Sequence, residues 1–249
     1  MTSKQDASND TATVDLREQL FNGGLFGSIK TVQLSTERIM QVRGVLYDID
    51  PRMLLQSSIL PEVPTDPKEF YIVVAEPWIS RHDVLRKAEI RSSGRGLHAI
   101  LWFDAPVILE TEGEQDRWAG IIQAVQAALP TDPDAPGITA LTRPIGSLNG
   151  KNGAQVELLY AGEPVSADEV LSLYQDMCNA PFRTVMRILT GSDRLTPCPL
   201  CKKENSTLAA LNQKGSCYSG CGSVKLERLY DLVLAHRTLS GEGQADAAH

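Results

Sequence analysis

Short apolar runs with the residue types of β-strands occur at four places in the chain. They cover residues 39–47, 70–75, 97–103 and 155–160, and they are rich in Val, Ile, Leu, Tyr and Phe. Residues 89–93 lead through two glycines into the third run. We expect these runs to form strands.

The clearest helix is expected over residues 115–129, where apolar side chains recur every three to four positions. They are Trp118, Ile121, Ile122, Val125 and Leu129, and Pro130 follows to end the helix. Further helices are expected over residues 15–21, 80–87, 166–178, 182–189 and 225–238, with Ser80 and Ser166 as N-caps. Because strands and helices are mixed without strict alternation, the predicted fold class is α+β.

The chain divides into four parts by composition. Residues 1–14 and 241–249 are polar tails, residues 15–190 form the main domain, and residues 191–240 form a small cysteine-containing unit with a closing helix. No apolar run approaches the roughly 20 residues that cross a bilayer, and the first residues lack a signal-peptide segment. We therefore expect a soluble, cytoplasmic protein without a membrane partner.

The overall charge restricts the classes of function. The net charge is −7 and the isoelectric point is near 5.2. A protein that coats DNA by neutralising its phosphates is usually basic, so this role is disfavoured. An enzyme with acidic metal ligands and a local basic groove is compatible with the same charge.

Two aspartates follow the first predicted strand. Side chains alternate between the faces of a strand, so Asp48 and Asp50 point to the same side. Mg²⁺ prefers oxygen ligands, and paired carboxylates at a strand end are suited to hold it. The alternative is a solvated strand end that turns into a loop at Pro51.

A glycine-rich segment precedes the third strand. Gly94 and Gly96 allow the backbone to approach a phosphate, while Ser93 and Arg95 supply donors and His98 begins the strand. The alternative is a tight hairpin turn followed by a structural histidine.

Two polar loops follow the best helix. The first carries Asp132 and Asp134, and the second carries Arg143 and Lys151 among turn residues. The alternative interpretation is that both are ordinary surface loops.

In order and in local sequence, these segments resemble the primase-polymerase (archaeo-eukaryotic primase) superfamily. Its pattern is an Asp-x-Asp strand, a Ser-Gly-x-Gly-x-His strand and a third acidic position. Residues 48–51 and 93–98 are similar to the first two, and Asp132 is the choice for the third, with Asp134 as the alternative. Residues 143–151 are similar to the Arg-x-Pro-Gly-x-x-Asn-x-Lys stretch of replication primases, although Ile145 stands directly before Gly146.

The resemblance covers about residues 40–160 and implies a split α/β fold with an RRM-like sheet that carries the acids. It implies template-directed nucleotidyl transfer in DNA replication or repair, on single-stranded DNA with nucleoside triphosphates. The implied catalytic residues are Asp48, Asp50, His98 and Asp132, of which the three aspartates would hold two Mg²⁺ or Mn²⁺ ions for a two-metal mechanism. The implied nucleotide-binding residues are Ser93, Gly94, Arg95, Gly96, His98, Arg143 and Lys151. A helicase would be a separate protein, since the sequence has no Gly-x-x-x-x-Gly-Lys phosphate loop.

One departure leaves an alternative open. The separation between Asp50 and His98 is long, because the strand-like run 70–75 intervenes. If that run were the acidic strand, Glu76 would be its only acid.

Four cysteines near the C-terminus have the spacing of a zinc ribbon. Cys198 and Cys201 form one pair, and Cys217 and Cys221 form a second about fifteen residues later. Four thiolates close the coordination shell, so the zinc would be structural. Two disulfides are the alternative, which requires an oxidising compartment.

Three hypotheses follow for the function. The first is a primase or primer-extending polymerase. The second is a catalytically inactive primase-fold protein that binds nucleic acid in a replication complex. The third is a zinc-ribbon interaction module on an unrelated α/β body.

Overall fold

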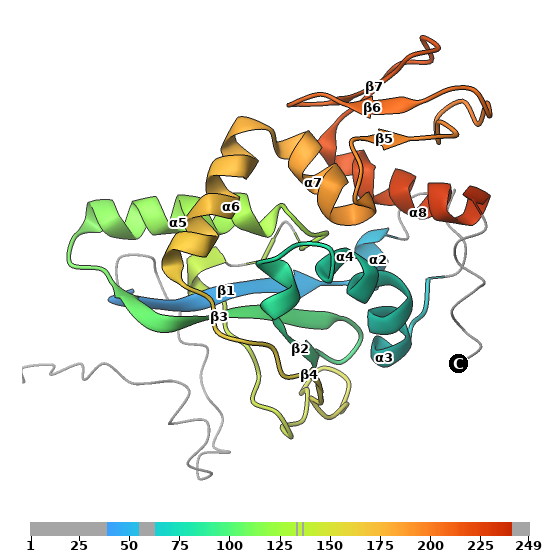
Figure 1. The fold of residues 1–249 in the computed structure, drawn as a ribbon. Helices are drawn as coiled ribbons and strands as arrows, with labels where there is room; N and C mark the ends of the chain where they lie inside the picture. The colour runs from blue at the N-terminus through green and yellow to red at the C-terminus, as the bar shows by residue number, and fades with distance from the viewer. Residues whose placement is uncertain (1–38, 55–62, 133, 136, 241–249) are drawn as a thin grey trace, which may run out of the picture.

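Two antiparallel sheets and several helices form the protein, as the predicted α+β class requires (Figure 1). The computed structural model describes residues 39–54, 63–132, 134, 135 and 137–240. The helix expected over residues 15–21 and both polar tails lie outside these residues. Within the described part of the chain, no helix has the length and apolar character needed to cross a membrane.

The first sheet has four strands in the order β1-β3-β2-β4. Their bounds are β1 Gln41–Ile49, β2 Glu89–Ser92, β3 Leu97–Ile108 and β4 Leu158–Tyr160. All three pairings are antiparallel. In this register His98 lies opposite Asp48 of β1 and opposite Arg91 of β2. The two ends that carry the glycine and aspartate motifs are therefore neighbours.

The two faces of this sheet differ in character. On one face Val45, Tyr47 and Ile49 are buried in the core. Helices α5 (Glu112–Gln126) and α6 (Ala167–Asn179) cover this face, where the rings of Trp118 and Phe103 meet edge to face at 5.8 Å (Figure 1). Because side chains alternate along a strand, Asp48 points to the other face.

Local capping fixes the predicted helices. The Thr111 and Ser166 hydroxyls each accept a bond from the backbone N–H three residues on, and the glutamate there bonds back to the cap. Helix α7 (Pro181–Thr190) ends at Gly191 in the left-handed conformation. The helices predicted over residues 115–129, 166–178 and 182–189 are confirmed, with shifted ends.

The strand predicted over residues 70–75 is wrong, because this run is helical. Helix α3 (Pro67–Phe70), the π-helical turn η2 (Tyr71–Ala75) and helix α4 (Glu76–Ile79) follow one another. Asp66 caps the start by accepting bonds from two backbone N–H groups. Buried residues recur at helical rather than alternating spacing: Phe70, Val74, Ala75, Trp78 and Ile79.

Two further consequences follow from this helical segment. Glu76 lies on a helix, so the alternative of an acidic strand there is excluded. Ser80 ends α4 instead of starting a helix, and only the short 3₁₀ turn η3 (Leu85–Lys87) forms in the expected range 80–87. The remaining short helices are α2 (Pro51–Leu54) and the 3₁₀ turn η4 (Gly137–Thr139).

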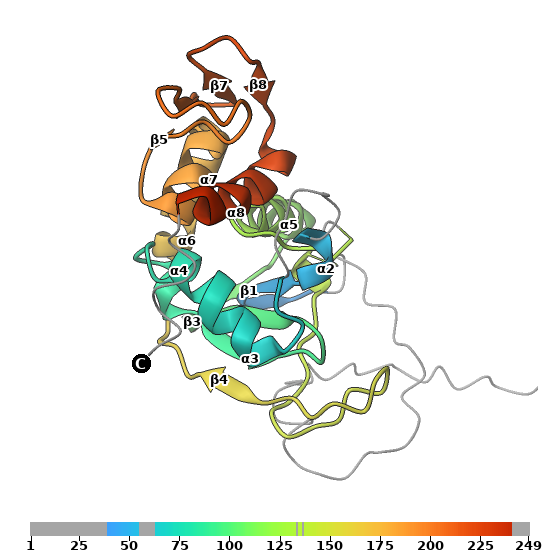
Figure 2. The ribbon, with the colours of Figure 1, turned by 90° about the vertical axis from the view of Figure 1, so that its right-hand side faces the viewer.

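The C-terminal unit, here called the ribbon, is a sheet of four short strands in the order β5-β6-β7-β8. They are β5 Arg194–Leu195, β6 Leu208–Ala210, β7 Gly215–Cys217 and β8 Ser223–Val224, followed by the 3₁₀ turn η5 (Leu226–Arg228) and helix α8 (Leu229–Ser240). The ribbon lies over α7 and α8 (Figure 2). Ribbon and body share one apolar core, and a Cβ on Gly215 would lie 2.6 Å from the Phe182 ring.

Candidate functional site

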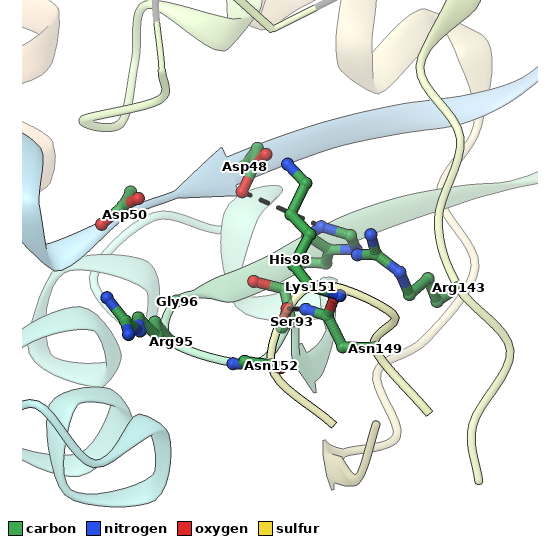
Figure 3. Close-up of a pocket in the computed structure, with 10 residues that line it drawn as sticks. All are labelled: Asp48, Asp50, Ser93, Arg95, Gly96, His98, Arg143, Asn149, Lys151 and Asn152. Atoms are coloured by element: carbon green, nitrogen blue, oxygen red, sulfur yellow. Dashed lines mark hydrogen bonds and ion pairs between the residues drawn. The ribbon is translucent and has the colours of Figure 1, made fainter. Parts of the chain in front are cut away.

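A cavity of about 330 Å³ lies on the sheet face that carries Asp48 (Figure 3). This volume is within the range of small-molecule binding sites. Its lining brings together segments from β1, the β2–β3 turn and the loop before β4: Asp48, Asp50, Ser93, Arg95, Gly96, His98, Arg143, Asn149, Lys151 and Asn152. Eight of these ten residues are among those that the sequence marked as candidates.

Steric contact explains the second glycine of the motif. A Cβ on Gly96 would lie 2.4 Å from the carbonyl oxygen of Ile49. Only glycine lets β3 begin this close to the end of β1. The close approach sets Asp48 and His98 side by side across the strands.

A substitution tests this contact. Gly96→Ala is expected to lower the free energy of unfolding by about 1–3 kcal/mol, because the neighbour is backbone and has to shift. Urea unfolding measures the change. Gly120→Ala is the matched control, since Gly120 lies in α5 with nothing near its Cβ position, and alanine there should be neutral or stabilising. Equal unfolding midpoints for Gly96→Ala and the unmodified protein would contradict the steric argument.

The first glycine of the motif packs against a second segment. Gly94 has φ +113°, and its Cβ position would lie 2.4 Å from Nδ2 of Asn149. That Nδ2 donates to the Ser93 carbonyl at 2.6 Å, and Oδ1 of the same side chain accepts from the Lys151 N–H at 3.0 Å. Asn149 is only 5% exposed, so it fixes the loop that carries Lys151 to the glycine turn.

The sequence analysis missed Asn149 and Asn152 as lining residues. Both lie in Asn149-Gly150-Lys151-Asn152-Gly153, a run of turn-forming residues. Such a run predicts a turn, but it gives no indication of which distant strand the turn contacts.

Arg143 is held near the cavity by a buried arginine. Arg91 forms an ion pair with Glu89 in the same strand and donates through Nη1 to the Arg143 carbonyl at 2.9 Å. In Figure 3 the side chains of Arg143 and Lys151 extend toward His98 and Asp48. The sequence analysis did not single out this positioning role of Arg91.

His98 is a neutral ring at physiological pH. Burial, and to a lesser extent the nearby Arg143 and Arg91, lower the pKa of His98 to about 4. Its Nδ1 lies 3.0 Å from the Thr142 hydroxyl, and its Nε2 lies 3.8 Å from Oδ1 of Asp48. The second distance is too long for a hydrogen bond, so this contact is not a strong ion pair.

Asp48 lies among other carboxylates. Its pKa is raised, first by burial and then by Asp132 and Asp50, while Lys151 and Arg143 oppose the shift. Asp132 lies close to Asp48 because the backbone N–H of Asp132 donates to the backbone carbonyl of Asp48 at 2.9 Å. A divalent cation would offset this repulsion, so the pair Asp48 and Asp50 fits such an ion by its chemistry.

Asp132 does not line the cavity with the other two acids. Its Oδ1 accepts the backbone N–H of Asp134 at 2.9 Å, and Asp134 itself is exposed. Among the residues that the structure describes, only the cysteine cluster groups three or more His, Cys, Asp or Glu side chains for a metal ion. The three aspartates therefore do not form a complete three-ligand group in this structure.

The four cysteines of the ribbon come together as their spacing predicts. The sulfur atoms of Cys198, Cys201, Cys217 and Cys221 all lie within 4.8 Å of one another. Those of Cys198 and Cys221 are 3.9 Å apart. Tetrahedral ligands at about 2.3 Å from zinc are separated by about 3.8 Å, so the cluster can bind a metal such as zinc. All four are free thiols, so the alternative of two disulfides is not what the structure contains.

Comparisons with known proteins found no relative of this chain: no protein-family model, no curated protein and no solved structure matches it.

Proposed function

We propose that the protein is a template-directed nucleotidyltransferase that synthesises or extends a primer on single-stranded DNA. The observation that carries the proposal is the common cavity of three segments that are far apart in the chain. The lining includes Asp48 and Asp50 from the first segment, Ser93, Arg95, Gly96 and His98 from the second, and Arg143 with Lys151 from the third. These are the segments that resemble primase-polymerases. If the resemblance were a coincidence, there would be no reason to expect all three segments to line one cavity.

The charges of the cavity suit a nucleoside triphosphate. Carboxylates stand at one side, while Arg95, Arg143 and Lys151 supply three cationic groups for phosphates (Figure 3). The small Ser93 lines the cavity and has a hydroxyl that can donate to a phosphate oxygen. His98 adds a ring nitrogen without adding charge, because burial keeps it neutral.

Asp48 and Asp50 would hold the divalent cation, Mg²⁺ or Mn²⁺. When bound there, the ion would supply Lewis-acid chemistry, favouring loss of the proton of an attacking 3′-hydroxyl and balancing the charge of a leaving pyrophosphate. Lys151 and Arg143 lie close enough to Asp48 to affect its pKa, so they also reach the place where the phosphates would meet the cation. Asp132 would support the site from beside Asp48.

The cysteine cluster would hold a structural Zn²⁺. Four thiolates leave no open position for a substrate, so the metal would act on folding and not on chemistry. The ribbon shares its apolar core with the body, and loss of the metal would therefore disturb both.

Incorporation of labelled nucleotides on single-stranded DNA tests the proposal. Reactions with and without a primer, each in Mg²⁺ and in Mn²⁺, are expected to give product that depends on the metal. Product in the unprimed reaction would identify a primase, and product only with a primer would identify a primer-extending polymerase. No product in any of these reactions would contradict the proposed activity.

A specific observation supports a second candidate, an inactive primase-fold protein that binds nucleic acid. The third acid, Asp132, has its carboxylate bonded to a backbone N–H and lies outside the cavity lining. In that case calorimetry would detect triphosphate binding that Arg143→Gln and Lys151→Gln weaken, although no product forms. Absence of both binding and product would leave the third reading, an interaction module.

A further inference from the structure

A second cavity, of about 190 Å³, lies where the ribbon meets the body. It is formed by the turn after α4, the end of α7, strand β5 and helix α8, which the two views place together at this junction (Figures 1 and 2). Its lining residues are Arg81, Leu189, Thr190, Ser192, Arg194, Leu195, Thr196, Val233, His236 and Arg237. None of them lines the first cavity.

Among the described residues that line it, the ionisable ones are three arginines and one histidine, and none is acidic. In a chain with net charge −7, this is a local concentration of positive charge. The neighbouring Asp193 offsets only part of this charge. The Arg187 guanidinium binds both Asp193 oxygens, at 2.5 and 2.8 Å, and it lowers the pKa of Asp193 more than the nearby Arg183 and Arg194 do. Positive charges that lie this close together repel one another, and a bound anion would relieve this repulsion.

Local contacts orient two of these arginines without using all of their donors. Arg81 donates through Nη1 to the Leu189 carbonyl at 2.8 Å. The Arg194 guanidinium lies over the Tyr218 ring, 5.9 Å from its centre, a contact that involves its face and not its N–H edge. A guanidinium has five N–H donors, so both side chains keep donors for a ligand.

Ser192 adds a hydroxyl between the arginines. Its Oγ accepts a hydrogen bond from the backbone N–H of Arg194 at 3.1 Å, so the hydroxyl proton is left to donate to another acceptor. A cavity that presents mainly donors and positive charge selects an acceptor-rich anion.

We propose that this second cavity binds a phosphate group. The planar donor edge of a guanidinium matches the oxygens of phosphate, and several such groups around one ion give charge-assisted bonds. The volume is below the roughly 300 Å³ at which sites for larger ligands begin, so the cavity suits phosphate oxygens and not a complete nucleotide. The phosphate belongs either to a small polyphosphate or to the backbone of a nucleic acid strand.

This binding is separate from the activity proposed for the first cavity. The test therefore uses two forms of the full chain, the unmodified protein and the variant Arg143→Gln with Lys151→Gln. The second form lacks two cations of the first cavity, so phosphate binding at the two cavities can be distinguished. The probes are tripolyphosphate, followed by titration calorimetry, and a fluorescein-labelled single-stranded DNA, followed by anisotropy over a series of salt concentrations.

In both forms, Arg194→Gln with Arg237→Gln is expected to lower the affinity for one or both probes at least about 10-fold. A loss confined to tripolyphosphate identifies a small polyphosphate as the ligand. A loss of DNA affinity, with the salt slope reduced by about 1.4 for two phosphate contacts, identifies the strand backbone. Arg194→Lys with Arg237→Lys should retain part of the binding, since it keeps the charge.

Matched variants make the result decisive. Arg43→Gln with Arg117→Gln removes the same charge from exposed positions on β1 and α5, and it should change neither probe by more than about twofold. Thermal melting and metal content show that each variant is folded. Unchanged affinity for both probes in folded Arg194→Gln with Arg237→Gln would overturn the proposal, as would an equal loss in the control variant.

Discussion

Asp48→Asn combined with Asp50→Asn is expected to reduce nucleotide incorporation at least about 10³-fold. Asparagine keeps the size of each side chain but removes the negative charges that would hold the divalent cation. Charge stabilisation by such an ion contributes several kcal/mol to a transition state, and each 1.4 kcal/mol is tenfold in rate. Primer extension under single-turnover conditions, in Mg²⁺ and in Mn²⁺, measures the loss.

The fold should tolerate this double substitution. Burial and the carboxylates around it raise the pKa of Asp48, so the ionised Asp48 side chain destabilises the folded state. Asparagine removes this charge and therefore the destabilisation. The melting temperature is therefore expected to stay the same or to rise. Asp83→Asn with Asp116→Asn, which changes two exposed aspartates elsewhere, is the control for net charge. Full activity in the Asp48 and Asp50 variant would remove the proposed metal site, whatever its stability.

Cys217→Ser is expected to release the ribbon metal and to lower the melting temperature by at least about 10 °C. A structural zinc contributes its binding energy to folding, and loss of a few kcal/mol corresponds to this shift in a chain of this size. The effect should extend beyond the ribbon, because Cys217 and Cys198 are buried in the core shared with the body. Metal analysis by mass spectrometry and thermal unfolding by circular dichroism measure both quantities.

Cys178→Ser is the matched control for this experiment. Cys178 is exposed at the end of α6 and lies outside the metal cluster. This variant should keep one zinc per chain and an unchanged melting temperature. If Cys217→Ser also kept its metal and its melting temperature, the cluster would not be a structural zinc site.

Much of the local structure could be predicted because it depends on residues close together in the chain. The capping pair Ser166 and Glu169 encodes its helix start within four residues. The glycines at 94 and 96 and the aspartates at 48 and 50 could be selected as a site from residue type and spacing. The roles of these residues in nucleotide transfer stay predictions.

The failures have a common physical cause. The run 70–75 has strand-like residue types, but Asp66 and Pro67 start a helix before it, and burial of Phe70, Val74 and Trp78 on one side stabilises that helix. Residue types in a six-residue window do not contain this information. For the same reason Ser80, a good cap by type, lies at the end of a helix.

The α+β class, the four clustered cysteines and the order of the motif segments could be predicted from the sequence, because each depends on short-range patterns. The tertiary structure was needed to show that Asn149 joins the Lys151 loop to the glycine turn and that Asp132 lies beside Asp48 but outside the cavity. It also decided that Arg81, Arg194 and Arg237 meet at one junction, across more than 150 positions of the chain. Such contacts depend on how sheets and helices pack, and that packing is set by the whole core and not by neighbours in sequence.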